Sequence, residues 1–187
     1  MISEKLRKGH LLIAEPSIIC DISFNRSVIL LAEHNNTEGS IGFIINKPLK
    51  YTLNELIPDI HADFQIYNGG PVEQDNLYFI HNIPKIITNS IEISSGIYWG
   101  GDFETTKNLI NEGKIKKSHI RFFLGYTGWE VKQLEQETQL NSWIVAKNRY
   151  ENKIIGQSTT NFWKEKILEL GGDYMIWSNS PENPLLN

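Results

Sequence analysis

The chain alternates between short apolar runs and short polar segments that are rich in turn-forming residues. Two runs, 26–33 and 41–45, have few polar positions on either face, which is typical of strands buried on both sides. Similar runs predict further strands at 10–14, 64–67, 77–81, 119–125 and 143–146. Turn formers fill the segment from His34 to Gly39, so the two strands that it joins are expected to form an antiparallel hairpin.

Four segments carry helix signals. Thr52 and Glu55 have capping-box spacing, which predicts a short helix that ends near Pro58. Asp102 is expected to cap a helix that runs through Asn111. Further helices are predicted over 130–139 and 160–170, and the second of these has a broad apolar face.

Predicted strands follow one another as often as they alternate with helices, which favours an α+β fold over a regular βαβ fold. The length of 187 residues suits one domain, and no repeat, low-complexity segment or linker divides the chain. We therefore predict a single domain over 1–187. Prolines and asparagines are frequent in 178–187, which predicts an extended C-terminal tail.

Charge and composition argue against several classes of partner. The net charge of −4 gives no long-range attraction for nucleic acid or anionic lipid. The densest basic stretch, 114–117, lies where a helix is expected to end, and lysines there complement the helix dipole. Direct DNA binding and membrane association are therefore not expected. A charged N-terminus and the lack of an apolar run of ~18 residues predict a cytoplasmic protein.

The chain has a single cysteine, Cys20, which suits a reducing compartment. Asp21 beside it would raise the thiol pKa, so Cys20 is expected to pack as a small hydrophobe and not to act as a nucleophile.

Standard catalytic and cofactor motifs are absent. The chain has no phosphate-binding P-loop, no dinucleotide-binding glycine fingerprint and no nucleophile elbow. Its five histidines are far apart, and none has a partner at metal-ligand spacing. We predict no cofactor and no metal site, although ligands that converge from distant positions would escape this test.

Four glycine- and aromatic-rich stretches stand out instead: 46–48, 68–72, 98–102 and 125–129. Each has an ordinary interpretation as a tight turn with aromatic packing. The alternative is that these strand ends line one concave binding site. The stretch 98–102 opens a helix, whose free N–H groups attract anions. Gln133 and Glu137, four residues apart, are expected to share a helix face.

In these stretches the chain resembles the YqgE/AlgH family. The resemblance extends from about Gly9 to Trp143, with weaker similarity beyond, and rests on the order and spacing of many short motifs. These include Gly42-x-x-x-Asn46-Lys47-Pro48, Gly69-Gly70-Pro71-Val72, Gly100-Gly101-Asp102 and Gly125-Tyr126-x-Gly128-Trp129, followed by Gln133-Leu134-Glu135-x-Glu137.

The resemblance implies a single α+β domain with a mixed, partly barrel-like sheet and flanking helices. The resemblance also implies a role in transcriptional regulation of exopolysaccharide synthesis, which has been proposed for the family. No catalytic residues are established for the family, so the resemblance implies none here. The recurring residues suggest a binding pocket formed by Asn46, Gly70, His81, Tyr126, Trp129 and Gln133. The chain departs from the family pattern Gly-Trp-Gly-Pro-Gly-Gln-Leu, because Glu130, Val131 and Lys132 replace two glycines and a proline.

Three functions remain open from the sequence. The first is a regulatory protein that binds a metabolite or a protein partner and acts on transcription indirectly. The second is an enzyme on a small anionic or nucleotide-like substrate, with His81 as acid or base, although no catalytic constellation is visible. The third is an assembly role, for which an apolar patch around Trp99 or Trp163 would be needed.

Overall fold

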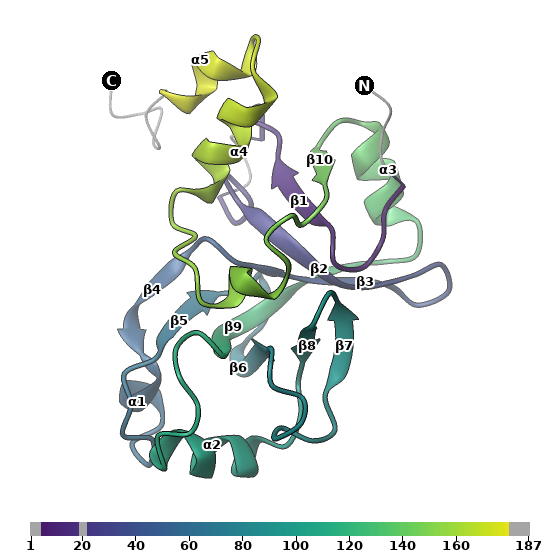
Figure 1. The fold of residues 1–187 in the computed structure, drawn as a ribbon. Helices are drawn as coiled ribbons and strands as arrows, with labels where there is room; N and C mark the ends of the chain where they lie inside the picture. Colours follow the sequence, from purple (N-terminus) through teal and green to yellow (C-terminus); the bar gives the residue numbers. More distant parts are fainter. Residues whose placement is uncertain (1–4, 19–21, 180–187) are drawn as a thin grey trace.

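The computed structural model describes residues 5–18 and 22–179, which form one α+β domain around a mixed sheet of ten strands (Figure 1). The strands are β1 (Leu11–Ala14), β2 (Val28–Asn35), β3 (Gly39–Ile44), β4 (Pro48–Thr52), β5 (Gln65–Asn68), β6 (Val72–His81), β7 (Ile91–Ser94), β8 (Ile97–Trp99), β9 (Ile120–Trp129) and β10 (Trp143–Ala146). The helices are α1 (Leu53–Leu56), α2 (Phe103–Asn111), α3 (Gln133–Gln139), the 3-10 helix η1 (Glu151–Ile155), α4 (Phe162–Leu170) and α5 (Tyr174–Ser178).

The sheet runs in the order β10-β1-β2-β3-β9-β6-β8-β7, and β4 and β5 pair beside β9. The predicted α+β class, with a mixed sheet and flanking helices, is confirmed. The sheet is not closed, because the main path ends at β10 on one side and at β7 on the other. No helix in the described part of the chain has the length and apolar character that crossing a bilayer requires.

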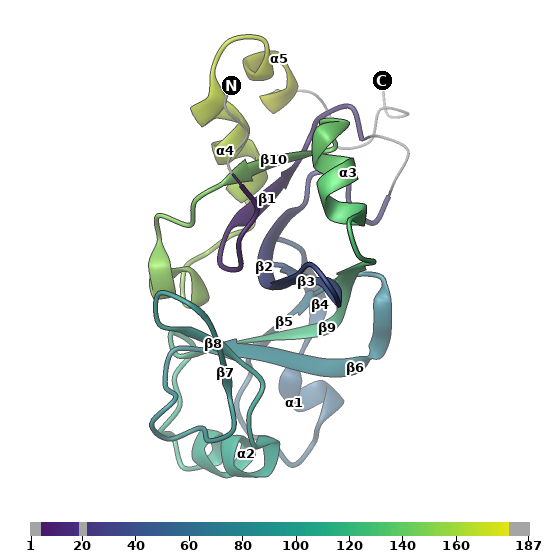
Figure 2. The same cartoon turned by 90° about the vertical axis from the view of Figure 1, so that its right-hand side faces the viewer.

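Strand β9 holds the two halves of the sheet together. Its first half pairs in parallel with β5 and antiparallel with β6, so that Phe122 lies opposite both Ile66 and Phe79. Its second half pairs antiparallel with β3, where Gly128 lies opposite Ile41. Figure 2 shows β9 running beside β6, with β1, β2 and β10 on one side and α1 and α2 on the other.

Two apolar cores follow from this arrangement. The larger is built mainly on β1, β2 and β3 and is covered by α3 and α4. The smaller lies among α1, α2 and the first half of β9. Within β9, Phe123 belongs to the larger core and Phe122 to the smaller, because successive side chains of a strand point to opposite faces.

Most predicted elements are confirmed. All seven predicted strands are present, and β2 and β3 form the expected antiparallel hairpin. Thr52 and Glu55 form the capping box of α1, and Asp102 caps α2 by accepting a hydrogen bond from the Thr105 N–H at 2.6 Å. Helices α3 and α4 begin three and two residues later than predicted.

Five elements were missed: β4, β7, β8, η1 and α5. Strand β4 begins with a proline and alternates polar with apolar residues, while β7 and β8 have four and three residues. Such short edge strands carry little periodicity. Strand β6 begins at Val72, before the predicted start at Leu77. The prediction missed the first half of this strand because that half is polar and exposed. Of the predicted tail 178–187, Ser178 ends α5, and 180–187 lie outside the described residues, as does Cys20.

Glycines allow two backbone segments to approach at the centre of the sheet. Gly125, in β9, has a φ of 69°, and a Cβ there would lie 2.6 Å from the Gly70 carbonyl oxygen and 2.7 Å from that of Val72. A Cβ on Gly70 would lie 2.2 Å from the Tyr126 carbonyl oxygen. No side chain fits at these positions, so the stretches 68–72 and 125–129 interlock through their backbones.

We predict that Gly125→Ala destabilises the protein by about 1–3 kcal/mol more than Gly113→Ala. Gly113 is the matched control because its φ is 71°, yet nothing would lie within 4 Å of a Cβ added there. Both variants incur the left-handed backbone cost of about 1–2 kcal/mol, and only Gly125→Ala adds the collision. Urea unfolding of both variants measures the difference. Equal losses would show that the backbones can separate without cost.

Candidate functional site

The structure brings four of the six predicted site residues together in two pairs and leaves the other two apart. Gly70 packs on the backbone of Tyr126. Trp129 and Gln133 both donate to the carboxylate of Glu137. Asn46 lies at the end of β3 and His81 at the end of β6. A binding role for any of the six remains a prediction.

Asn46 is buried and ties two chain segments together. Its Oδ1 accepts a hydrogen bond from the Val28 N–H at 2.8 Å, and its Nδ2 donates to the Arg26 carbonyl at 2.9 Å. It also borders a cavity of about 460 Å³, where the Arg26 guanidinium lies 4.9 Å from the centre of the Trp163 ring. The amide thus holds the start of β2 against the end of β3, which is the strand-end role that its type favours.

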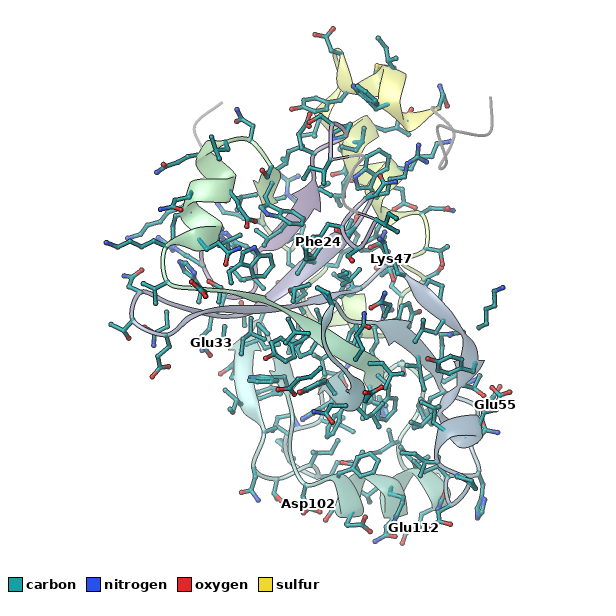
Figure 3. The ribbon with its side chains drawn as sticks, turned by 180° about the vertical axis from the view of Figure 1, so that it is seen from behind. Phe24, Glu33, Lys47, Glu55, Asp102 and Glu112 are labelled. Atoms are coloured by element: carbon teal, nitrogen blue, oxygen red, sulfur yellow. The ribbon has the colours of Figure 1, made fainter. Side chains whose placement is uncertain are left out.

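Glu137 gathers a polar network under α3. Its Oε2 accepts from the indole N–H groups of Trp129 at 2.9 Å and Trp143 at 2.7 Å, and its Oε1 accepts from Gln133 at 2.8 Å. Phe24, which is labelled in Figure 3, packs against both indoles, with ring centroids 6.5 Å and 5.4 Å away. The predicted shared face of Gln133 and Glu137 is confirmed, and this network fixes α3 to β9 and β10.

We predict that Glu137→Ala lowers the free energy of unfolding by about 2–4 kcal/mol. The change leaves two buried indole N–H groups without an acceptor, and each costs about 1–3 kcal/mol. Glu135→Ala is the control on the same helix, because Glu135 only faces His34 at 3.9 Å and should cost under about 1 kcal/mol. Chemical denaturation compares the two, and a similar loss in both would contradict a structural role for the network.

His81 is fully buried, so a substrate cannot reach its ring in this conformation. Its Nδ1 accepts a hydrogen bond from the Ile83 N–H at 3.2 Å, and its ring stacks on Tyr98 at 5.9 Å. Nε2 makes no hydrogen bond of standard geometry with a described residue, although the Gly100 backbone favours the protonated form. Burial outweighs that effect and lowers the pKa of His81 from 6.5 to about 4.

We predict that His81 makes stability depend on pH between 6.5 and 4. In this window the unfolded state binds a proton that the folded state does not, so stability falls as the pH falls. The loss from His81 reaches at most about 3 kcal/mol at pH 4. His81→Asn should flatten this part of the curve of unfolding free energy against pH, whereas His61→Asn, at an exposed position, should not. An unchanged slope in His81→Asn would contradict the prediction.

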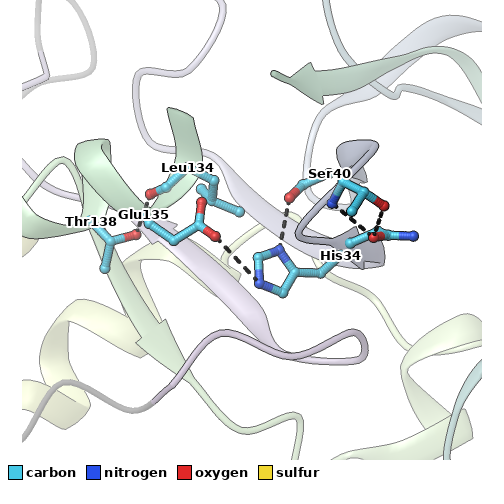
Figure 4. Close-up of polar contacts among 7 residues, drawn as sticks. His34, Ser40, Leu134, Glu135 and Thr138 are labelled. Atoms are coloured by element: carbon cyan, nitrogen blue, oxygen red, sulfur yellow. Dashed lines mark hydrogen bonds and ion pairs between the residues drawn. The ribbon is translucent and has the colours of Figure 1, made fainter. Parts of the chain in front are cut away.

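A Ser–His–Glu contact that was not predicted from the sequence joins the β2–β3 hairpin to α3 (Figure 4). The Nδ1 of His34 lies 2.9 Å from the Ser40 hydroxyl, and its Nε2 lies 3.9 Å from a Glu135 oxygen. The second distance is too long for a hydrogen bond, so the carboxylate does not orient the imidazole as a catalytic triad requires. Ser40 is also only 5% exposed. We therefore interpret the contact as structural: it holds α3 against the β2–β3 hairpin.

An apolar cleft of about 520 Å³ opens between β6, β8 and the start of α2. We call it the β6–β8 cleft, and it is lined by Ile57, Leu77, Tyr78, Phe79, Trp99, Gly100, Gly101 and Phe103. The predicted stretch 98–102 supplies three of these residues. At the start of α2, where an anion site was expected, the Asp102 carboxylate already accepts a hydrogen bond from the Thr105 N–H. The protein's own carboxylate therefore takes the place of an external anion at this N–H group. Hydrogen bonding to the Thr105 side chain, and then to its backbone N–H, lowers the pKa of Asp102.

Within residues 5–18 and 22–179, no three histidine, cysteine, aspartate or glutamate side chains gather in a way that would hold a metal ion.

The family model described as AlgH-like matches residues 11–175. The chain belongs to the AlgH-like family. The family that the sequence motifs indicated is therefore confirmed.

Relatives and solved structures agree with this AlgH-like assignment. A UPF0301 protein from Cytophaga hutchinsonii is 41% identical over 184 residues, which cover 97% of this chain and all of that protein. Another from Chlorobaculum tepidum is 40% identical over 185 residues, covering 98% and 97%. The solution structure of the AlgH protein from Pseudomonas aeruginosa has a TM-score of 0.69 at 26% identity, covering 97% of this chain and 98% of that one. A crystal structure from Corynebacterium diphtheriae has a TM-score of 0.72 at 21% identity, covering 96% and 95%, and shares the fold.

The departure from the AlgH-like glycine pattern changes side chains and leaves a glycine-like backbone. Lys132, where the family pattern has glycine, has a φ of 65°, in the region that glycine adopts without strain. The turn before α3 therefore keeps the backbone shape that a glycine would favour. The exposed side chains of Glu130, Val131 and Lys132 now cover it.

Proposed function

We propose that this AlgH-like protein is a cytoplasmic regulatory protein that binds a small, largely apolar organic molecule in the β6–β8 cleft. The supporting observation is the cleft itself, whose volume of about 520 Å³ lies within the roughly 300–1,000 Å³ of small-molecule sites. Its lining is aromatic and aliphatic, apart from the two glycines Gly100 and Gly101.

Binding is favoured over catalysis by the chemistry of this lining. The eight residues include no serine, cysteine, histidine or carboxylate. The one hydroxyl among them, that of Tyr78, donates to the exposed Glu73 carboxylate, and burial raises the pKa of Tyr78, which disfavours a phenolate nucleophile. The regulatory part of the proposal rests on the family resemblance. A net charge of −4 argues that the protein reaches transcription through a protein partner and does not contact DNA itself.

Trp99 provides a reporter inside the cleft. The indole N–H groups of Trp129 and Trp143 bind Glu137, and that of Trp163 donates to the Ala14 carbonyl at 2.7 Å. The Trp99 Nε1 is buried and has no hydrogen-bond partner among the described residues. Its NMR signal can therefore be assigned by Trp99→Phe and followed separately from the others.

We predict that a screen of small aromatic and aliphatic compounds finds ligands that shift the Trp99 indole signal and leave those of Trp143 and Trp163 in place. At 100 times its Kd, such a ligand adds about 2.7 kcal/mol of stability, which raises Tm by roughly 5–10 °C. Phe103→Ala should weaken binding. Leu109→Ala is the matched control, because Leu109 lies on the same helix and packs on the same core without lining the cleft.

Two results would overturn the proposal. One is a screen in which no compound shifts the Trp99 signal. The other is a set of ligands whose affinities fall equally in Phe103→Ala and Leu109→Ala, because binding would then not depend on the cleft lining.

A further inference from the structure

Arg121 is a buried cation with only neutral partners. Its side chain comes from the first half of β9 and is 4% exposed. The guanidinium donates to the backbone carbonyls of Ile45 at 2.9 Å and Ile155 at 3.1 Å, and also to the carbonyl of Gln157. A further hydrogen bond of 2.8 Å joins it to the Thr159 hydroxyl.

No described carboxylate forms an ion pair with Arg121, whose remaining close contact is the Tyr67 ring, 4.5 Å from the guanidinium carbon. A buried charge is expensive unless it is compensated, and here burial lowers the pKa of Arg121. A guanidinium has five N–H groups, and the four hydrogen bonds leave one N–H of Nη2 without an acceptor among the described residues.

A cavity of about 340 Å³ adjoins this guanidinium. Its polar lining consists of Gln65, Tyr67, Lys117, Arg121, Gln157 and Ser158. The cavity thus has two cationic residues and no acidic one in its lining. Lys117 is 64% exposed at its rim and pairs with Asp63 at 2.8 Å, which lowers the pKa of that carboxyl.

We propose that this cavity, which we call the Arg121 cavity, binds the phosphate group of a small molecule between Arg121 and Lys117. A phosphate oxygen would accept the remaining Nη2 N–H and supply the charge that the carbonyls do not, since arginine binds oxyanions through its fork of N–H groups. The Asp63 carboxylate competes for Lys117 and weakens the site. This inference concerns a different cavity from the β6–β8 cleft and does not depend on the proposed function.

The first experiment titrates the full chain with inorganic phosphate against sodium chloride at equal ionic strength. The readouts are Tm and the side-chain Nε–H signal of Arg121 in NMR spectra. We expect a saturable rise of Tm with phosphate alone and a shift of the Arg121 signal, while the Trp99 indole signal stays in place. Equal effects of phosphate and chloride, or an unmoved Arg121 signal, would overturn the proposal.

Three variants that leave the Arg121 hydrogen bonds intact sharpen the test. Lys117→Gln should weaken phosphate binding by roughly 3- to 10-fold, and Asp63→Asn should tighten it, because it frees Lys117. Lys114→Gln is the matched control, since Lys114 is also 63% exposed and pairs with Glu112. Equal effects of Lys117→Gln and Lys114→Gln, or weaker binding in Asp63→Asn, would contradict the site.

A second arm replaces inorganic phosphate with ribose 5-phosphate. Tighter binding of the ester supports a phosphorylated metabolite as the ligand, and weaker binding supports free phosphate in the same cavity. If neither compound binds, the cavity is not an anion site, and the neutral acceptors alone compensate Arg121.

Discussion

The architecture depends on one strand that must satisfy different partners along its two edges. The first half of β9 pairs with β5 and β6 at once, and its second half pairs with β3. Because a strand presents alternate side chains to opposite faces, Phe122 and Phe123 enter separate cores. Gly125 lies between the two halves, and its φ of 69° bends the strand where Gly70 and Val72 cross close to it. A strand without glycine there would separate the halves of the sheet.

Arg121 extends the same dependence to the C-terminal third of the chain. Its guanidinium joins β9 to the end of β3 and to the segment 155–159, which has little regular structure of its own. That segment leads into α4, whose Trp163 donates to Ala14 in β1. Neutral acceptors thus position the cation, while the charge remains uncompensated by any described carboxylate. A residue that organises the backbone in this way also leaves a positive charge beside a cavity.

The sequence predicted what local patterns encode. Apolar runs located seven strands, and Asp102 and the Thr52–Glu55 pair located two helix starts, because these signals act within a few residues. The candidate site was harder to predict from the sequence than the secondary structure. Glycines and aromatics indicated the segments that interlock at β9, but convergence depends on pairings such as Tyr126 with Val72, which join residues 54 positions apart. Arg121 carried no signal, because an arginine in an apolar strand becomes informative only when its neighbours are known.

The charged side chains of Glu137 and Arg121 differ in whether their surroundings leave room for a ligand. Glu137 receives hydrogen bonds from Trp129, Trp143 and Gln133, so neutral donors surround its carboxylate and α3 is fixed in place. Arg121 has neutral partners too, but one of its donors is unused among the described residues, and a cavity with a second cation, Lys117, lies next to it. The polar network around Glu137 is complete without a further molecule, whereas that around Arg121 still has a donor, a charge and a space for one. An anion is therefore better accommodated beside β9's first half than in the glycine- and tryptophan-rich turn that the family motifs emphasise.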